Sequence, residues 1–180
     1  MKLKRLLFSA LMLLSAGMTW ADVKINKKNF PDENFRIFLL SQDDGKDRVL
    51  TSAEIAEVTE IDVSEKEIRS LKGIEFFTAL KKLVCNCNEL TTLDMSKNTA
   101  LIELYCGFNQ LTSLDVSKNT ALKKLFCGDN KLTSLDVSNN TKLIELICFE
   151  NQLTSLDVSK NTALKCLLCD DDKVTITDNK

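Results

Sequence analysis

A 21-residue repeat runs through most of the chain and limits its fold more than any other feature. The unit reads Leu-x-x-Leu-x-Cys-x-x-Asn-x-Leu-x-x-Leu-Asp-Val-Ser-x-Asn-Thr, and its first leucine recurs at Leu80, Leu101, Leu122, Leu143 and Leu164. A looser 22-residue unit precedes these copies and begins at Val58. Because one such unit cannot bury its own apolar residues, successive units must stack as coils around a continuous core. The repeat therefore predicts a solenoid with 21-residue coils.

Hydrophobic alternation within one unit predicts where its side chains point. Leu104 and Cys106 alternate with Glu103, Tyr105 and Gly107, which is typical of a short strand with the first pair facing inward. A second alternation, Leu-Asp-Val, lies on the opposite side of each coil. One asparagine recurs in the repeat, at Asn88, Asn109, Asn130 and Asn151. We expect its side chain to point inward and to form hydrogen bonds with buried backbone groups of the turn.

The N-terminal segment has the pattern of a secretory signal peptide. Lys2, Lys4 and Arg5 precede an apolar run over residues 6–14, and Thr19-Trp20-Ala21 provides a cleavage site with small residues. The apolar run is too short to span a bilayer, which takes about 20 residues. We therefore expect residues 1–21 to be removed and the remaining protein to be secreted, into the periplasm or the extracellular space.

Residues 22–57 are expected to form a helical N-terminal cap on the solenoid, which then occupies residues 58–180. Phe35, Phe38 and Leu39 have helical spacing, and Thr51 with Glu54 forms a capping box that opens a second helix.

Part of the cap can be aligned with a twelve-residue calcium loop, with oxygen ligands at Asp43, Asp47, Thr51 and Glu54. Gly45 and Arg48 replace an oxygen donor and the turn glycine of that loop. We prefer the capping role for Glu54, so calcium is a weak candidate here, and no other cofactor is expected.

The repeats resemble the leucine-rich repeats of bacterial internalins, and in particular the internalin J type, in which cysteine replaces an inward leucine. The resemblance covers residues 58–180. It implies an α/β solenoid with short parallel strands and a helical N-terminal cap. It also implies a surface or secreted protein that acts in binding or adhesion and is not an enzyme.

Five cysteines occupy one repeat position and are predicted to form an inward ladder of Cys85, Cys106, Cys127, Cys148 and Cys169. Neighbouring strands lie about 4.8 Å apart, whereas disulfide Cβ atoms are about 3.5–4.5 Å apart. We prefer buried thiols, with disulfides as the alternative. Cys87 and Cys166 lie off the ladder, should face outward, and are candidates for free thiols.

Composition argues against two other classes of function. The chain has no histidine, the side chain that most often serves as general base and zinc ligand near neutral pH. Its formal net charge of −2 does not favour a nucleic-acid partner. We identify no catalytic residues, and the carboxylate row opposite the strands is interpreted as a solvated surface.

An outward apolar row on the concave strand face is the candidate ligand-binding site. It consists of Val84, Tyr105, Phe126, Ile147 and Leu168, with Phe108 and Phe149 beside it and an acidic edge that includes Asp129, Glu150 and Asp171. Exposed apolar rows often mark interaction sites, although aromatic side chains also stack between strands for structural reasons. We expect a protein or peptide partner, such as a host or bacterial surface protein. The alternative function is a self-assembling structural solenoid that pairs through its last strand, near residues 167–170.

Overall fold

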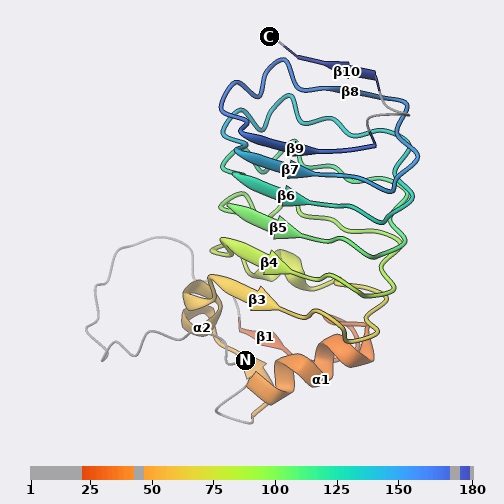
Figure 1. Ribbon diagram of the computed structural model, residues 1–180. Coiled ribbons are helices and arrows are strands. Elements are labelled where there is room, and N and C mark those ends of the chain that lie inside the picture. The colour runs from red at the N-terminus through yellow and green to blue at the C-terminus, as the bar shows by residue number, and fades with distance from the viewer. Residues whose placement is uncertain (1–21, 43–46, 171–174, 179–180) are drawn as a thin grey trace.

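The computed structural model describes residues 22–42, 47–170 and 175–178. Six short strands stack in parallel into one sheet, and the chain returns behind this sheet after each strand (Figure 1). In spatial order the strands are β3 (Glu60–Asp62), β4 (Lys82–Val84), β5 (Glu103–Tyr105), β6 (Lys124–Phe126), β7 (Glu145–Ile147) and β9 (Cys166–Leu168).

The register of this sheet follows the repeat. Glu60 pairs with Lys82, a step of 22 residues, and each later step joins positions 21 residues apart, as Lys82 pairs with Glu103. Residues at the same repeat position therefore stand in straight columns along the stack. This register confirms the solenoid with 21-residue coils.

The core consists of leucine columns and the cysteine ladder. The central residue of every strand from β3 to β7 is buried, while the residues on either side of it are partly exposed. Cys85, Cys106, Cys127 and Cys148 are buried in the same core, and Cys169 packs against it. The predicted inward direction of this ladder is confirmed.

Two asparagine columns form hydrogen bonds with buried backbone groups of each coil. In the expected column, the Asn130 amide nitrogen donates to the carbonyls of Cys106, Cys127 and Gly128, and its oxygen accepts from the Leu111 amide. The second column was not predicted and consists of Asn98, Asn119, Asn140 and Asn161 on the other side of the coil. Each of these amides donates to two carbonyls of the preceding coil.

The far side of each coil is built around a recurrent Asp-x-Ser turn. The Asp115 carboxylate accepts a hydrogen bond from the Ser117 amide at 2.8 Å, and the same contact recurs at Asp94, Asp136 and Asp157. Hydrogen bonds from the serine lower the pKa of each of these carboxyl groups. On this side β8 (Ser155–Asp157) pairs in parallel with β10 (Thr175–Thr177).

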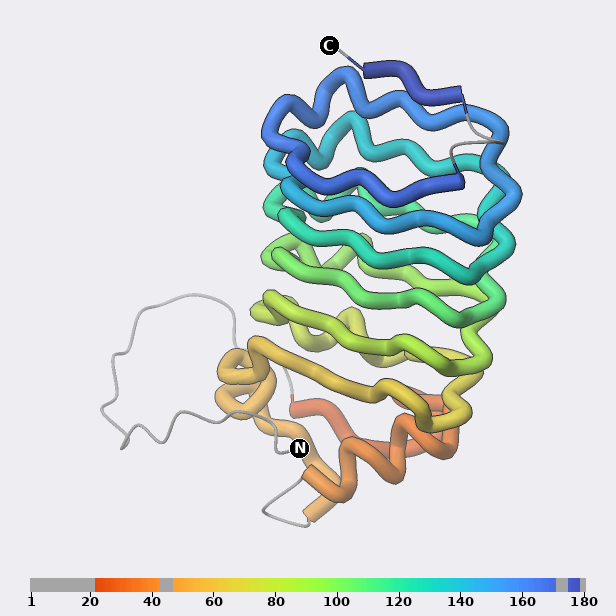
Figure 2. Tube along the Cα trace, viewed as in Figure 1, coloured from red at the N-terminus to blue at the C-terminus, as the bar shows by residue number. Residues whose placement is uncertain are grey.

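A small cap covers the N-terminal end of the stack (Figures 1 and 2). It contains an antiparallel strand pair and two α-helices: β1 (Val23–Lys24), α1 (Glu33–Gln42), β2 (Val49–Leu50) and α2 (Ser52–Glu57). A 3₁₀ helix, η1 (Ile74–Phe76), follows in the first coil of the solenoid. Helix α1 buries Phe35, Phe38 and Leu39, as its spacing predicted. The predicted capping box of Thr51 and Glu54 is also present. The expected signal peptide over residues 1–21 lies outside the described residues.

Candidate functional site

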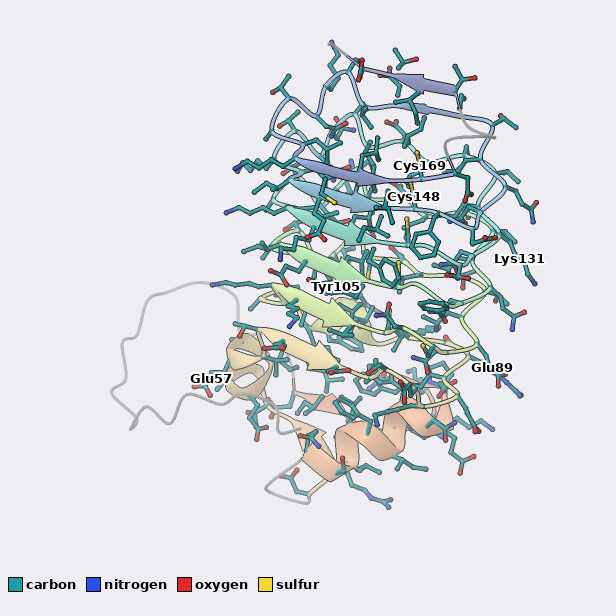
Figure 3. The ribbon with its side chains drawn as sticks, viewed as in Figure 1. Glu57, Glu89, Tyr105, Lys131, Cys148 and Cys169 are labelled. Atoms are coloured by element: carbon teal, nitrogen blue, oxygen red, sulfur yellow. The ribbon has the colours of Figure 1, made fainter. Side chains whose placement is uncertain are left out.

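The outward row forms a continuous column on the strand face, which we call the apolar strip: Val84, Tyr105, Phe126, Ile147 and Leu168. Each member pairs in register with the next, from Val84 on β4 to Leu168 on β9. Tyr105 lies near the middle of the sheet (Figure 3). The first four are partly exposed, and Leu168 is 50% exposed. The structure therefore brings all the predicted strip residues together on one surface.

Two glycines beside the strip leave room for the Phe126 and Phe149 rings to lie close to the backbone. A Cβ atom on Gly107 would overlap the Phe126 ring, and one on Gly128 would lie 3.3 Å from both the Phe126 and Phe149 rings. The Phe126 ring centroid is 5.9 Å from that of Phe108 and 6.1 Å from that of Phe149. These three rings, which we call the aromatic trio, thus join the strip to the edge where the strands end.

Phe108 occupies a backbone conformation that does not favour a bulky side chain. Its φ is 54°, and the equivalent residues Cys87, Asp129 and Glu150 also have positive φ, so the left-handed turn belongs to the coil. Glycine and asparagine adopt this conformation most easily. Phe108 nevertheless has a side chain that is 47% exposed. Neither the turn nor the core explains the presence of phenylalanine there.

Charges at the N-terminal edge of the strands are largely paired within the chain. Lys82 lies 3.1 Å from Glu60, and Lys124 lies 3.8 Å from Glu145. Glu103 instead accepts a hydrogen bond from the Tyr105 hydroxyl, so the alternating row of Lys82, Glu103, Lys124 and Glu145 forms ion pairs only in part. Burial, assisted by Glu103, raises the pKa of Tyr105 to about 12.

The C-terminal edge of the strands has a different charge pattern. Asp129 is partly exposed and Glu150 is exposed. Asp129 directly follows Gly128, which lies beneath two rings of the aromatic trio, and Glu150 directly follows Phe149. Neither carboxylate has an ion-pair partner among residues 22–42, 47–170 and 175–178. Asp170, which was not predicted as a site residue, accepts from the Glu150 amide at 3.1 Å. Asp171 lies outside the described residues.

A shallow hollow of about 300 Å³ opens on the strand face between these two edges. Its lining combines strip residues with polar side chains and includes Asn86, Tyr105, Lys124, Phe126, Glu145 and Ile147. A hollow of this kind can receive one apolar side chain of a partner while polar groups at its rim fix the orientation.

The buried cysteines of the ladder do not have the setting of a nucleophile. Cys85, Cys106, Cys127 and Cys148 form no disulfide bond, and burial raises the pKa of each of these thiols. A reactive cysteine needs the thiolate, which burial in apolar surroundings disfavours. Cys87 and Cys166 are exposed, as their position off the ladder predicted.

Three calcium-loop candidates in the cap are described, Asp47, Thr51 and Glu54, and their side chains form local hydrogen bonds. Glu54 accepts from both the amide and the hydroxyl of Thr51, and Asp47 accepts from the Val49 amide. Asp43 lies outside the described residues. In the part of the chain that the structure describes, no three acidic, cysteine or histidine side chains form a group that could hold a metal ion.

Comparison with known proteins adds independent information about this arrangement. No protein-family model matches the chain. Internalin J of Listeria monocytogenes is 42% identical over 75 residues, which cover 39% of this chain and 8% of that protein. The solved functional domain of InlJ from the same organism, which includes a cysteine ladder, superposes with a TM-score of 0.77 at 40% identity over 87% of this chain.

The chain is an internalin-type leucine-rich repeat protein. It spans 34% of the InlJ domain, so it corresponds to about a third of that chain. A leucine-rich repeat protein of Leptospira interrogans also matches, with a TM-score of 0.60 at 26% identity over 73% of this chain and 36% of that one. The internalin-type fold accounts for the ladder and the coil length.

Two features of the repeat were not predicted from the sequence, although each left a signal there. The second asparagine column was visible as the recurrent Asn-Thr pair, and the glycines as two successive units with Gly after the ladder cysteine. Neither signal gives the direction of a neighbouring ring.

Along the described ranges, no helix combines the length and apolar character needed to cross a membrane.

Proposed function

We propose that this chain is an exported protein-binding module that recognises its partner through the strand face and performs no catalysis. The observation that carries this proposal is the apolar strip, which remains partly exposed across five successive strands although each coil has a buried core available for such side chains. Exposed contiguous apolar surface in a monomeric protein is typical of an interaction site.

The fold supports the same function. Leucine-rich repeat solenoids present an extended surface of regularly spaced side chains, and this scaffold is typically non-catalytic. The aromatic side chains of the strip and trio belong to the residue types that contribute most to protein interfaces. An adhesive role on a host or bacterial surface is the specific form that we propose.

A capture experiment tests the proposed surface. The mature chain, residues 22–180, is immobilised and exposed to host and bacterial surface proteins, beside the triple variant Tyr105→Ser, Phe126→Ser, Ile147→Ser. A matched control replaces three exposed threonines of the far side by alanine, at Thr91, Thr112 and Thr133. Circular dichroism and thermal unfolding establish that all three proteins are folded.

We expect the wild type and the far-side control to capture the same partner and the strip variant to lose it. Equal capture by all three proteins would assign the strip to packing instead. Sedimentation of the mature chain over a range of concentrations distinguishes this function from self-assembly. Export is tested by N-terminal sequencing of the secreted protein, which we expect to begin at Asp22.

A further inference from the structure

The aromatic trio and the acidic residues beside it lie at the same edge of the strand face. Gly128 lies beneath the Phe126 and Phe149 rings, and Asp129 is the next residue of the chain. Glu150 follows Phe149 directly and occupies the next position in the column of Asp129. We call this surface the aromatic–acidic edge: Phe108, Phe126, Phe149, Asp129 and Glu150.

The carboxylates of this edge differ from others on the same face. At the N-terminal edge of the strands, Glu60 and Glu145 have lysine partners, and near the cap Glu89 has Arg69 at 2.8 Å. Lys131, the basic residue nearest in sequence to Asp129, directs its ammonium group to the Gln110 side chain at 3.4 Å. Lys131 and Glu89 both lie at the edge where the strands end (Figure 3).

Aromatic rings and carboxylates share one preferred ligand class. The face of an aromatic ring attracts a cation, and a neighbouring carboxylate adds a charge-assisted hydrogen bond. Arginine satisfies both contacts better than lysine because its planar guanidinium group stacks on rings and donates to a carboxylate in a fixed geometry. A nucleic acid or an anionic glycan would instead be repelled by this edge.

We propose that the aromatic–acidic edge binds an arginine side chain of a protein partner, whose neighbouring apolar residue lies on the apolar strip. This inference rests on the proposed function and specifies the chemistry of the partner. Phe108 supports it, because an exposed phenylalanine occupies a turn position where a smaller residue would meet less strain. The arginine supplies the positive charge that Asp129 and Glu150 lack within the described part of the chain.

The test uses a defined probe and an uncharged analogue of the same shape. N-acetyl-leucyl-arginine amide is titrated into the mature chain with ¹³C-labelled phenylalanine rings, and the analogue carries citrulline in place of arginine. We expect the arginine peptide to shift the resonances of Phe108, Phe126 and Phe149 saturably. The citrulline peptide should bind at least about tenfold more weakly, because the cation contributes to both ring and carboxylate contacts.

Two pairs of isosteric substitutions locate the effect. The double variant Asp129→Asn, Glu150→Gln should prefer arginine over citrulline much less strongly, because only the rings then contact the cation. The control variant Glu33→Gln, Glu57→Gln changes two exposed carboxylates of the cap and should keep the full preference for arginine. Equal binding of both peptides to the wild type, a preference that is undiminished in the first double variant, or no saturable shift would each overturn the proposal.

Capture of the protein partner separates this inference from the proposed function. In one outcome, the strip variant loses the partner, the variant Asp129→Asn, Glu150→Gln retains it, and the wild type binds the arginine and citrulline peptides equally. The arginine proposal then fails, while the proposed function stands. If the strip variant captures the partner as the wild type does, the proposed function fails whatever the peptides do.

Discussion

The two sides of each coil are built under different constraints. On the far side, successive units repeat nearly the same residues, Leu-Thr-Ser-Leu-Asp-Val-Ser, and the structure gives the Asp and Ser defined turn contacts. On the strand face, the position held by Tyr105 becomes Phe126, Ile147 and Leu168 in the following coils. The far side therefore maintains the coil, while the strand face varies without changing its register.

The two sides should also lose stability at opposite ends of the pH range, which is the largest effect that we expect. Burial raises the pKa of the ladder thiols, to about 12 for Cys148. Unfolded thiols ionise above about pH 8.5 while folded ones stay protonated, so the free energy of unfolding must fall as pH rises through this window. Each thiol contributes a slope of about 1.4 kcal/mol per pH unit, or roughly 5 kcal/mol per unit for four.

Denaturant unfolding between pH 7.5 and pH 10.5, with a phosphine reductant, measures this slope. Cys127→Ala should reduce the slope by about 1.4 kcal/mol per pH unit, the contribution of one thiol. This difference separates the ladder thiols from other groups that titrate at alkaline pH. A free energy of unfolding that stays constant up to pH 10 would contradict the assignment.

At the acidic end of the pH range, the far-side carboxyl groups have lowered pKa values, so their contribution to stability is present above about pH 4 and is lost on acidification.

The two asparagine columns should differ in their contribution to stability. Asn130→Ala leaves three carbonyls and the Leu111 amide without their buried partner, which we expect to cost about 3–5 kcal/mol. Asn119→Ala on the far side removes two donated bonds, and its own oxygen has no hydrogen-bond partner within the described ranges. Its cost should be smaller, at about 2 kcal/mol. Urea unfolding of both variants tests the order, and equal losses would show that the bond count does not decide it.

The strand-face glycines provide a smaller and more local test. Gly107→Ala forces the Phe126 ring to move and should cost about 1–3 kcal/mol, as overpacking usually does. Gly128→Ala is the matched control, because its Cβ would lie 3.3 Å from the rings and should cost less than about 1 kcal/mol. Thermal unfolding and the ring resonances of Phe126 report both changes. Equal shifts in the two variants would mean that the rings adapt freely.

Among these variants, Phe108→Asn should have the smallest effect on stability, yet it should weaken binding of the arginine peptide. Asparagine relieves the strain of positive φ, but the substitution removes the ring contact with Phe126, so stability should change by less than about 1 kcal/mol. Binding of the arginine peptide should weaken because one aromatic surface is lost. A loss of more than about 2 kcal/mol would instead identify Phe108 as a packing residue.

The sequence allowed prediction of those features that depend on periodicity or local hydrogen bonding. The columns follow from the repeat length, the inward cysteines from alternation, and the cap helix from the Thr51 and Glu54 capping box. Features that depend on side-chain direction between coils were not predictable in this way. The Phe126 ring could have covered the preceding or the following coil, and only packing over Gly107 and Gly128 decides its position. The alternating row of Lys82, Glu103, Lys124 and Glu145 shows the same limit, because the Tyr105 hydroxyl donates a hydrogen bond to Glu103.

The constant register described above has a consequence for how such a surface can change. Since each coil advances the sheet by one strand, removing residues 101–121 would bring Val84 beside Phe126 with every inward column still aligned. Gain or loss of a whole unit therefore alters the length of the strand face in steps of about 4.8 Å. It also exchanges the neighbours of each side chain without disturbing the core. Duplication or deletion of one unit can thus change the pattern of exposed side chains on this face, without any point substitution.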